Sequence, residues 1–217
     1  MYLEDLNFRI LKVLSEGWRN VISLDIETDV RTRGEFLTDE YILSIALASR
    51  RQGSLLSATG IETEVLMLEE QTEEAEINLL NELNSLFGKQ RPLGLVGYGF
   101  RGYDIPLLLM KCQKYKSRLD APLWKVIDAL QQAAHVDLYA MLKTWYRVKN
   151  FREAVSAEAF HDLPLKREKG LVSNDFKNKG EDIVRMWRED HEAFLRYAEG
   201  DVVDTLLIAE QILKTRA

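Results

Sequence analysis

Asn20-Val-Ile-Ser-Leu-Asp-Ile-Glu-Thr28 is the stretch from which the fold of this chain can be worked out. Its apolar residues predict a buried β-strand that ends in two carboxylates, Asp25 and Glu27. Side chains alternate across a strand, so these two acids point to the same face. Neighbouring buried acids repel each other unless a divalent cation lies between them or water reaches them freely. The pair therefore indicates either a metal site or a strand end that simply meets solvent.

Two further strands are expected after this stretch. Tyr41–Ser49 is rich in β-forming residues, and Glu64–Leu68 forms the next strand after a break at Gly53. Successive strands with short polar connections are typical of an antiparallel meander. Before them, residues 1–18 carry apolar side chains at roughly helical spacing, closed by Gly17, which predicts a short helix packed against the main body.

The remainder of the chain alternates between helix and strand patterns. In order, we expect a helix at Thr72–Leu86, a strand at Leu93–Gly97, a helix at Ile105–Lys114, a helix beginning at Pro122, a strand at His135–Leu138, helices near 138–147 and 152–160, a mobile loop at 162–180 and a closing helix pair after Gly180. This order predicts an α/β fold in which a mixed central sheet, an antiparallel meander plus parallel strands, is flanked by helices. The length suits one domain over residues 1–217.

Overall charge and hydropathy limit the classes of function. The net charge of −6 argues against indiscriminate coating of nucleic acid, which normally uses a basic surface. No apolar run approaches the roughly 18 residues of a membrane span, and the acidic start Met1–Leu6 does not fit a secretory signal. We therefore expect a cytoplasmic protein without membrane contacts. The single cysteine, Cys112, is expected to be a small buried or half-buried thiol.

Charged residues are unevenly distributed along the chain. An acidic block most simply forms a solvated face and comprises Glu62, Glu64, Glu69, Glu70, Glu73, Glu74 and Glu76. A later segment is basic and comprises Lys143, Arg147, Lys149, Arg152, Lys166, Arg167 and Lys169. Such basic stretches are more often solvated faces than binding sites, so the asymmetry alone indicates little.

A glycine-rich turn follows the strand at Leu93–Gly97. Its glycines, Gly97, Gly99 and Gly102, match the G-x-G-x-x-G fingerprint of dinucleotide-binding proteins, and Asp120 lies about where the ribose-binding acid is expected. Three strands precede this unit, whereas the fingerprint usually opens its βαβ unit, and Asp120 does not follow a strand. The match is weak evidence for a nucleotide-dependent oxidoreductase.

The same turn has a second interpretation in its last residues, Tyr103-Asp-Ile-Pro106. Proline is tolerated in the first turn of a helix, so a helix begins here. Asp104 then either caps that helix or directs a carboxylate into the cleft that holds Asp25 and Glu27.

The last helix supplies a further acid. Tyr197 and Asp201 are four residues apart and therefore share one helical face. Alone, this spacing usually means a half-buried tyrosine beside a surface acid. The helix is otherwise strongly apolar from Val202 to Leu213, so an acid within it needs a partner.

These segments together resemble a known family. Asp25-Ile-Glu27, the turn ending in Tyr103-Asp104, and Tyr197-x-x-x-Asp201 occur in that order. They resemble the three motifs of the DEDD 3′–5′ exonucleases, in the subclass with tyrosine, and the chain looks closest to the proofreading exonuclease domain of family B DNA polymerases. The resemblance covers about residues 20–210 and implies a ribonuclease H-like fold. Gly99 is a departure, because the family usually has an asparagine there that approaches the substrate.

The resemblance implies a metal-dependent hydrolysis of phosphodiester bonds. Asp25, Glu27, Asp104 and Asp201 would hold two divalent ions, Mg²⁺ or Mn²⁺, which prefer hard oxygen ligands. Tyr197 would orient the attacking water through its hydroxyl group. Among substrate contacts, Thr28 would meet the terminal 3′-hydroxyl with its backbone N–H. An aromatic ring of Phe100 or Tyr103 would stack on a base, although either ring is equally compatible with the core.

The expected substrate is the 3′ end of nucleic acid, single-stranded DNA first, with RNA as an alternative. The chain ends at Ala217 without polymerase motifs, which suggests a stand-alone nuclease that works beside replication or repair proteins. Two rival classes remain open: a catalytically idle accessory module with a nuclease fold, and the nucleotide-dependent oxidoreductase.

Overall fold

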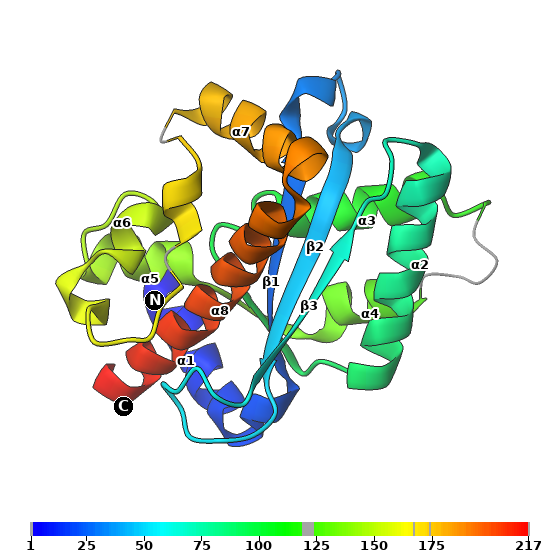
Figure 1. Cartoon of the computed structure of the whole chain (residues 1–217). Helices are drawn as coiled ribbons and strands as arrows, with labels where there is room; N and C mark the ends of the chain where they lie inside the picture. The colour runs from blue at the N-terminus through cyan, green and yellow to red at the C-terminus, as the bar shows by residue number, and fades with distance from the viewer. Residues whose placement is uncertain (1, 119–123, 167, 174, 217) are drawn as a thin grey trace.

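The computed structural model describes residues 2–118, 124–166, 168–173 and 175–216. Its strands form one five-stranded sheet in the order β3-β2-β1-β4-β5 (Figure 1). The strands are β1 Val21–Asp29, β2 Tyr41–Arg50, β3 Ile61–Met67, β4 Gly94–Gly97 and β5 Ala134–Asp137. The α-helices are α1 Leu3–Leu14, α2 Glu73–Gln90, α3 Asp104–Lys114, α4 Trp124–Gln132, α5 Leu138–Trp145, α6 Phe151–Val155, α7 Phe176–Glu189 and α8 His191–Arg216.

β1 occupies the centre of the sheet and pairs differently on its two sides. It runs antiparallel to β2, which runs antiparallel to β3, so the expected meander is confirmed. On the other side β1 runs parallel to β4, and β4 runs parallel to β5. Because Val21 pairs with Gly94 and Ser23 with Val96, the glycine-rich turn after β4 begins alongside Asp25. The sheet is therefore mixed and flanked by helices, as the sequence predicts.

The alternation of side chains along β1 divides the core into two clusters. Ile22, Leu24 and Ile26 pack in the cluster that contains apolar residues of α2 and α3. Val21 packs in the cluster on the opposite face, with most of the apolar residues of α8. Asp25 lies an even number of residues after Val21 on the strand, so its side chain is directed toward the same face, the one covered by α8. Figure 1 shows α8 crossing this face, with α2, α3 and α4 on the other side.

β1 is longer than the sequence pattern suggests. It continues beyond the two acids to Asp29, and its pairing with β2 shifts between Glu27 and Thr28, as at a β-bulge. The end is fixed by the Asp29 carboxylate, which accepts hydrogen bonds from Arg31 and Gln71. Asp25 and Glu27 thus lie inside the strand rather than at its end.

The interpretation of 162–180 as a mobile loop is wrong in its last part, because α7 already begins at Phe176. Gly180, read from the sequence as the end of that loop, lies within the helix. A Cβ atom at this position would lie 2.3 Å from Val30 Cγ2, so the absent side chain permits α7 to approach the end of β1. Glycine here serves close packing rather than a break.

The acidic block is largely a solvated face, but Glu76 is an exception. It is 0% exposed, and its carboxylate accepts hydrogen bonds from Lys111, Tyr115 and the backbone N–H of Ile42. Cys112 is buried as expected, and burial raises the pKa of its thiol to about 12.

Two positions used in the sequence arguments, Asp120 and Pro122, lie outside the described residues. Within the part of the chain that the structure describes, no helix combines the length and apolar character that crossing a membrane requires.

Candidate metal centre

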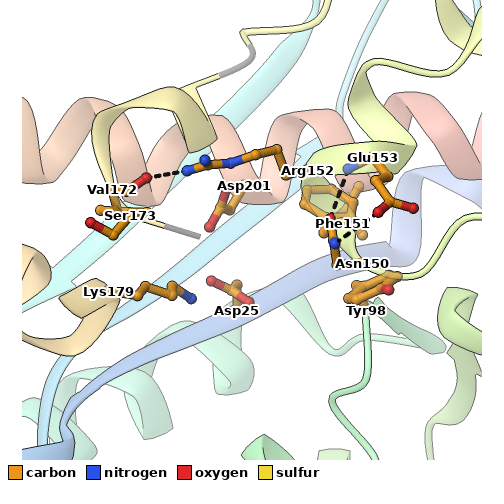
Figure 2. Close-up of a pocket in the computed structure, with 11 residues that line it drawn as sticks. Asp25, Tyr98, Asn150, Phe151, Arg152, Glu153, Val172, Ser173, Lys179 and Asp201 are labelled. Atoms are coloured by element: carbon orange, nitrogen blue, oxygen red, sulfur yellow. Dashed lines mark hydrogen bonds between the residues drawn. The ribbon is translucent and has the colours of Figure 1, made fainter. Parts of the chain in front are cut away.

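Three carboxylates from distant parts of the chain meet on the α8 face of the sheet. Asp25 and Glu27 come from β1, and Asp201 comes from α8; one oxygen of each lies within 4.8 Å of the others. Figure 2 shows Asp201 facing Asp25. Glu27 and Asp201 are only 6% and 2% exposed, so water alone does not separate their charges. A cluster of hard oxygen donors in such a place suits a divalent cation such as Mg²⁺ or Mn²⁺.

The fourth predicted acid, Asp104, lies beside this cluster rather than within it. It is the first residue of α3, one position past the cap residue Tyr103, so it does not act as the N-cap. It is 6% exposed and lines a cavity together with Asp25 and Glu27. Burial and the nearby charges of Asp25 and Glu27 raise the pKa of Asp104 well above its usual range. Its carboxylate form therefore needs a positive charge close by.

Tyr197 reaches the cluster from α8, one turn before Asp201. Its side chain is 0% exposed, and its hydroxyl is hydrogen-bonded to Glu27. Burial, together with the negative charges of Asp201, Glu27 and Asp25, raises the pKa of Tyr197 well above its usual value. The phenol is accordingly protonated at neutral pH and acts as a hydrogen-bond donor.

Two cavities adjoin the acids, and they share Asp25, Tyr98 and Lys179 in their walls. The larger cavity is about 580 Å³ and opens toward α6 (Figure 2). The smaller cavity is about 370 Å³ and lies toward the end of β1 and the start of α3. Because the two cavities share these residues, the acids lie where the cavities adjoin.

Thr28 and Tyr103 lie in the wall of the smaller cavity and are joined through a buried acid. Glu40 is 0% exposed, and Thr28 Oγ1 donates a hydrogen bond of 2.8 Å to it. The hydroxyl of Tyr103 and the guanidinium of Arg33 also donate to Glu40. Burial and the hydrogen bond with Glu40 raise the pKa of Tyr103 to about 12. The cluster fixes both hydroxyl groups in the wall of the smaller cavity.

The suggestion that Phe100 stacks on a base is wrong. Its side chain is 0% exposed and lies in the core, with its ring 5.7 Å from that of His135. A Cβ atom on Gly97 would lie 2.5 Å from the Phe100 ring, so the turn folds this ring beneath its own backbone. The rings that do line the larger cavity belong to Tyr98 and Phe151.

Sequence reasoning missed Lys179, which belongs to both cavities. Its Nζ lies 3.9 Å from Glu27 Oε1, and Figure 2 shows its amine pointing toward Asp25. In the sequence this lysine lies among other charged residues of the segment read as a loop. Its neighbour Gly180 permits α7 to approach Val30, but in the sequence a glycine there equally indicates the end of a loop.

The hydrogen bonds made by the glycine-rich turn do not suit the binding of a dinucleotide. The backbone N–H groups of Gly99 and Arg101, which would have to cradle a pyrophosphate, donate instead to the carboxylate of Asp137. The helix that follows begins with Asp104, whose negative charge would oppose a phosphate at that terminus. The sheet also lacks the parallel opening that the fingerprint needs, because β1 to β3 form the meander.

Comparisons with known proteins identify the fold. No family model matches the chain, and no curated protein matches it. A solved structure of the family B DNA polymerase from the hyperthermophilic archaeon Pyrobaculum calidifontis is similar, with a TM-score of 0.64 and 20% sequence identity. The match covers 89% of this chain and 24% of the polymerase chain. This chain, about a quarter of that polymerase in length, thus has the ribonuclease H-like fold of part of a family B DNA polymerase.

Proposed function

We propose that the protein is a metal-dependent 3′–5′ exonuclease that hydrolyses phosphodiester bonds at the 3′ end of single-stranded DNA. The observation that carries the proposal is the meeting of Asp25, Glu27 and Asp201, whose oxygens lie within 4.8 Å of one another. Buried acids so close together are costly unless cations neutralise them. The likeness to a family B DNA polymerase agrees with the resemblance of the three motifs to the proofreading exonuclease domain of that family.

The residues would divide into two sets of ligands. Asp25, Glu27 and Asp201 would hold one divalent ion, and Asp25 with Asp104 would hold a second. The bound ions would supply a nucleophile from water at neutral pH and stabilise the leaving oxygen. The raised pKa of Asp104 agrees with this assignment, because a nearby cation would stabilise its carboxylate form.

Tyr197 and Lys179 have separate tasks in this scheme. Because its pKa is raised, Tyr197 keeps its proton and orients water through its hydroxyl group rather than acting as a base. Lys179 brings a positive charge to the acids, 3.9 Å from Glu27, where the negatively charged substrate has to approach. Thr28 and Tyr103, held by Glu40, would contact the terminal nucleotide.

The proposal is tested with a 5′-fluorescein single-stranded DNA and Mg²⁺ or Mn²⁺. We expect a ladder of products that shorten from the 3′ end, and no products in EDTA. Asp25→Asn and Asp201→Asn should lose at least about a hundredfold in rate, since each removes a charged ligand. Asp5→Asn is the matched control, because Asp5 is an exposed acid on α1. Activity that survives EDTA, or site variants as active as the control, would refute the proposal.

Thermal denaturation provides a second readout that does not depend on turnover. A ligand that binds only the folded state stabilises it by about 2.7 kcal/mol at a hundred times its Kd. Mn²⁺ should therefore raise the Tm of the wild-type protein and of Asp5→Asn, but not that of Asp25→Asn. DNA binding with the metal shift but without turnover would favour the idle accessory module. RNA of the same sequence, assayed in parallel, measures the preference between the two nucleic acids.

A further inference from the structure

Three aromatic rings form a row that begins at the larger cavity and ends at the protein surface. The ring of Tyr98 lies 5.1 Å from that of Phe151 and 5.6 Å from that of Tyr139. Tyr98 and Phe151 line the cavity beside Asp25, whereas Tyr139 on α5 lies farther out and is 38% exposed. Aromatic faces of this kind bind successive bases of a single strand without regard to sequence.

Positive side chains accompany the row. Lys143 Nζ lies 5.3 Å from the centre of the Tyr139 ring and donates a hydrogen bond of 3.2 Å to its hydroxyl. Arg152 lines the cavity, where it is hydrogen-bonded to the carbonyl of Val172 (Figure 2). Because the chain has a net charge of −6, its overall composition does not account for positive side chains gathered beside aromatic rings. Rings for bases and cations for phosphates are the two parts of a single-strand site.

The two cavities differ in what they offer a strand. The smaller one is lined by the polar group of Thr28, Tyr103 and Arg33 around Glu40, and suits the sugar of one terminal nucleotide. The larger one is lined by Asp25 and Tyr98, and the exposed Tyr139 lies against Tyr98 outside it, which suits a chain that continues to the surface. When a strand is cut at its 3′ end, the rest of the strand extends away from the acids in the 5′ direction.

We propose that the strand on the 5′ side of the scissile phosphate passes through the larger cavity and over Tyr139. Its first base would lie against Tyr98 and the next against Tyr139, with phosphates beside Arg152 and Lys143. This path rests on the proposed exonuclease function. It makes Tyr139 and Lys143 positioning residues that set affinity for longer strands and do not touch the reacting phosphate.

The test compares substrates that differ in reach. One is a single strand of about ten thymidines, within the range of known single-strand sites; the other is a thymidine dinucleotide, which ends before Tyr139. Tyr139→Ala should lower kcat/KM on the longer strand about tenfold, mainly through KM, and leave the dinucleotide unchanged. Tyr139→Phe keeps the ring and should behave as wild type, and Lys143→Gln should weaken binding with a smaller salt dependence. Tyr2→Ala and Lys89→Gln, both at exposed positions away from the two cavities, are the matched controls.

Binding is measured separately by fluorescence anisotropy of the labelled longer strand in EDTA, where no turnover occurs. We expect Tyr139→Ala to raise the Kd about tenfold relative to wild type and to Tyr2→Ala. An unchanged Kd and KM on the longer strand would overturn the path while leaving the exonuclease intact. An equal loss on the dinucleotide would also overturn it, because it would show a general defect. A wild-type protein that binds the strand in EDTA but cuts neither substrate would refute the exonuclease and leave the binding path standing.

Discussion

Lys179 Nζ lies 3.9 Å from Glu27 Oε1, so a lysine of α7 reaches the carboxylates of the central strand. Among the charges that act on Asp104, this lysine lowers the pKa, against burial, Asp25 and Glu27, which raise it. The carboxylate form of Asp104 in turn needs a positive charge close by. The lysine and the acids therefore form one electrostatic unit, although α7 contributes none of the proposed ligands.

Lys179→Gln should lower kcat/KM about tenfold and move the acidic limb of the pH profile to higher pH. The rate falls because the phosphate loses a nearby positive charge. The limb moves because, without the lysine, the pKa of Asp104 rises further and its carboxylate form is reached only at higher pH. The measurement is kcat/KM on the labelled strand across pH, with Lys89→Gln as control. An unshifted profile with normal activity would show that the amine only fills space.

Asp104 should also make the metal-free protein less stable as pH rises. Its pKa in the folded state is raised by burial, Asp25 and Glu27, whereas an unfolded aspartate titrates near about 3.9. Between these two pKa values the folded state binds more protons, so its free energy of unfolding falls with increasing pH. Thermal denaturation in EDTA from about pH 4 upward should show this fall, and Asp104→Asn should make it shallower. If stability falls equally with pH in the wild-type protein and in Asp104→Asn, the proton responsible is bound by another group.

Glu40 should position the wall of the smaller cavity. Glu40→Gln keeps the shape of the side chain but removes its negative charge. That charged carboxylate accepts hydrogen bonds from the hydroxyls of Thr28 and Tyr103 and from the guanidinium of Arg33. Hydrogen bonds to a charged group contribute about 1.5–3 kcal/mol, so a loss of stability of this size is expected. KM should rise while kcat changes less, because the terminal nucleotide loses its fixed contacts. Tyr103→Phe, which removes one hydroxyl, should have a smaller effect on both quantities.

Gly99 should accept asparagine. Its φ is +72°, a left-handed conformation that asparagine tolerates far better than β-branched residues do. A Cβ atom there meets nothing within 4 Å, so the side chain would project into the smaller cavity without a clash. Gly99→Asn should therefore fold normally and lower KM for the strand, while Gly99→Val should lose about 1–3 kcal/mol of stability. A Gly99→Asn protein with an unchanged KM would show that this position does not contact the substrate.

The parts of the site that depend on local spacing were predictable. A spacing of two residues on a strand places Asp25 and Glu27 on one face. A spacing of four residues on a helix places Tyr197 beside Asp201. The order of elements also predicted the mixed sheet, since short polar connections favour the meander and a helix must separate parallel strands.

The contacts between remote segments were not predictable in this way. Nothing in the spacing of Lys179 tells that α7 packs against the end of β1. Phe100 and Tyr98 are two residues apart in the same turn, and only the fold of the turn decides that one ring is buried in the core and the other lines the cavity. Thr28 was singled out, but its partner Glu40 lies twelve residues later in the chain, immediately before β2.

Glu76 illustrates the same point within a run of acids, and its replacement should be costly. Its carboxylate lies 2.7 Å from Lys111 Nζ, and both side chains are almost fully buried. Glu76→Leu would leave the lysine, whose pKa burial already lowers, without its partner, and removing one member of a buried pair costs about 3–5 kcal/mol. Urea denaturation should show this loss, whereas Glu74→Leu at an exposed position of the same block should change stability by less than about 0.5 kcal/mol.

The double variant Glu76→Leu with Lys111→Met should recover part of the loss, because no charge is then buried alone. If the double variant is no more stable than Glu76→Leu, the cost lies instead in the lost hydrogen bonds of Tyr115 and Ile42.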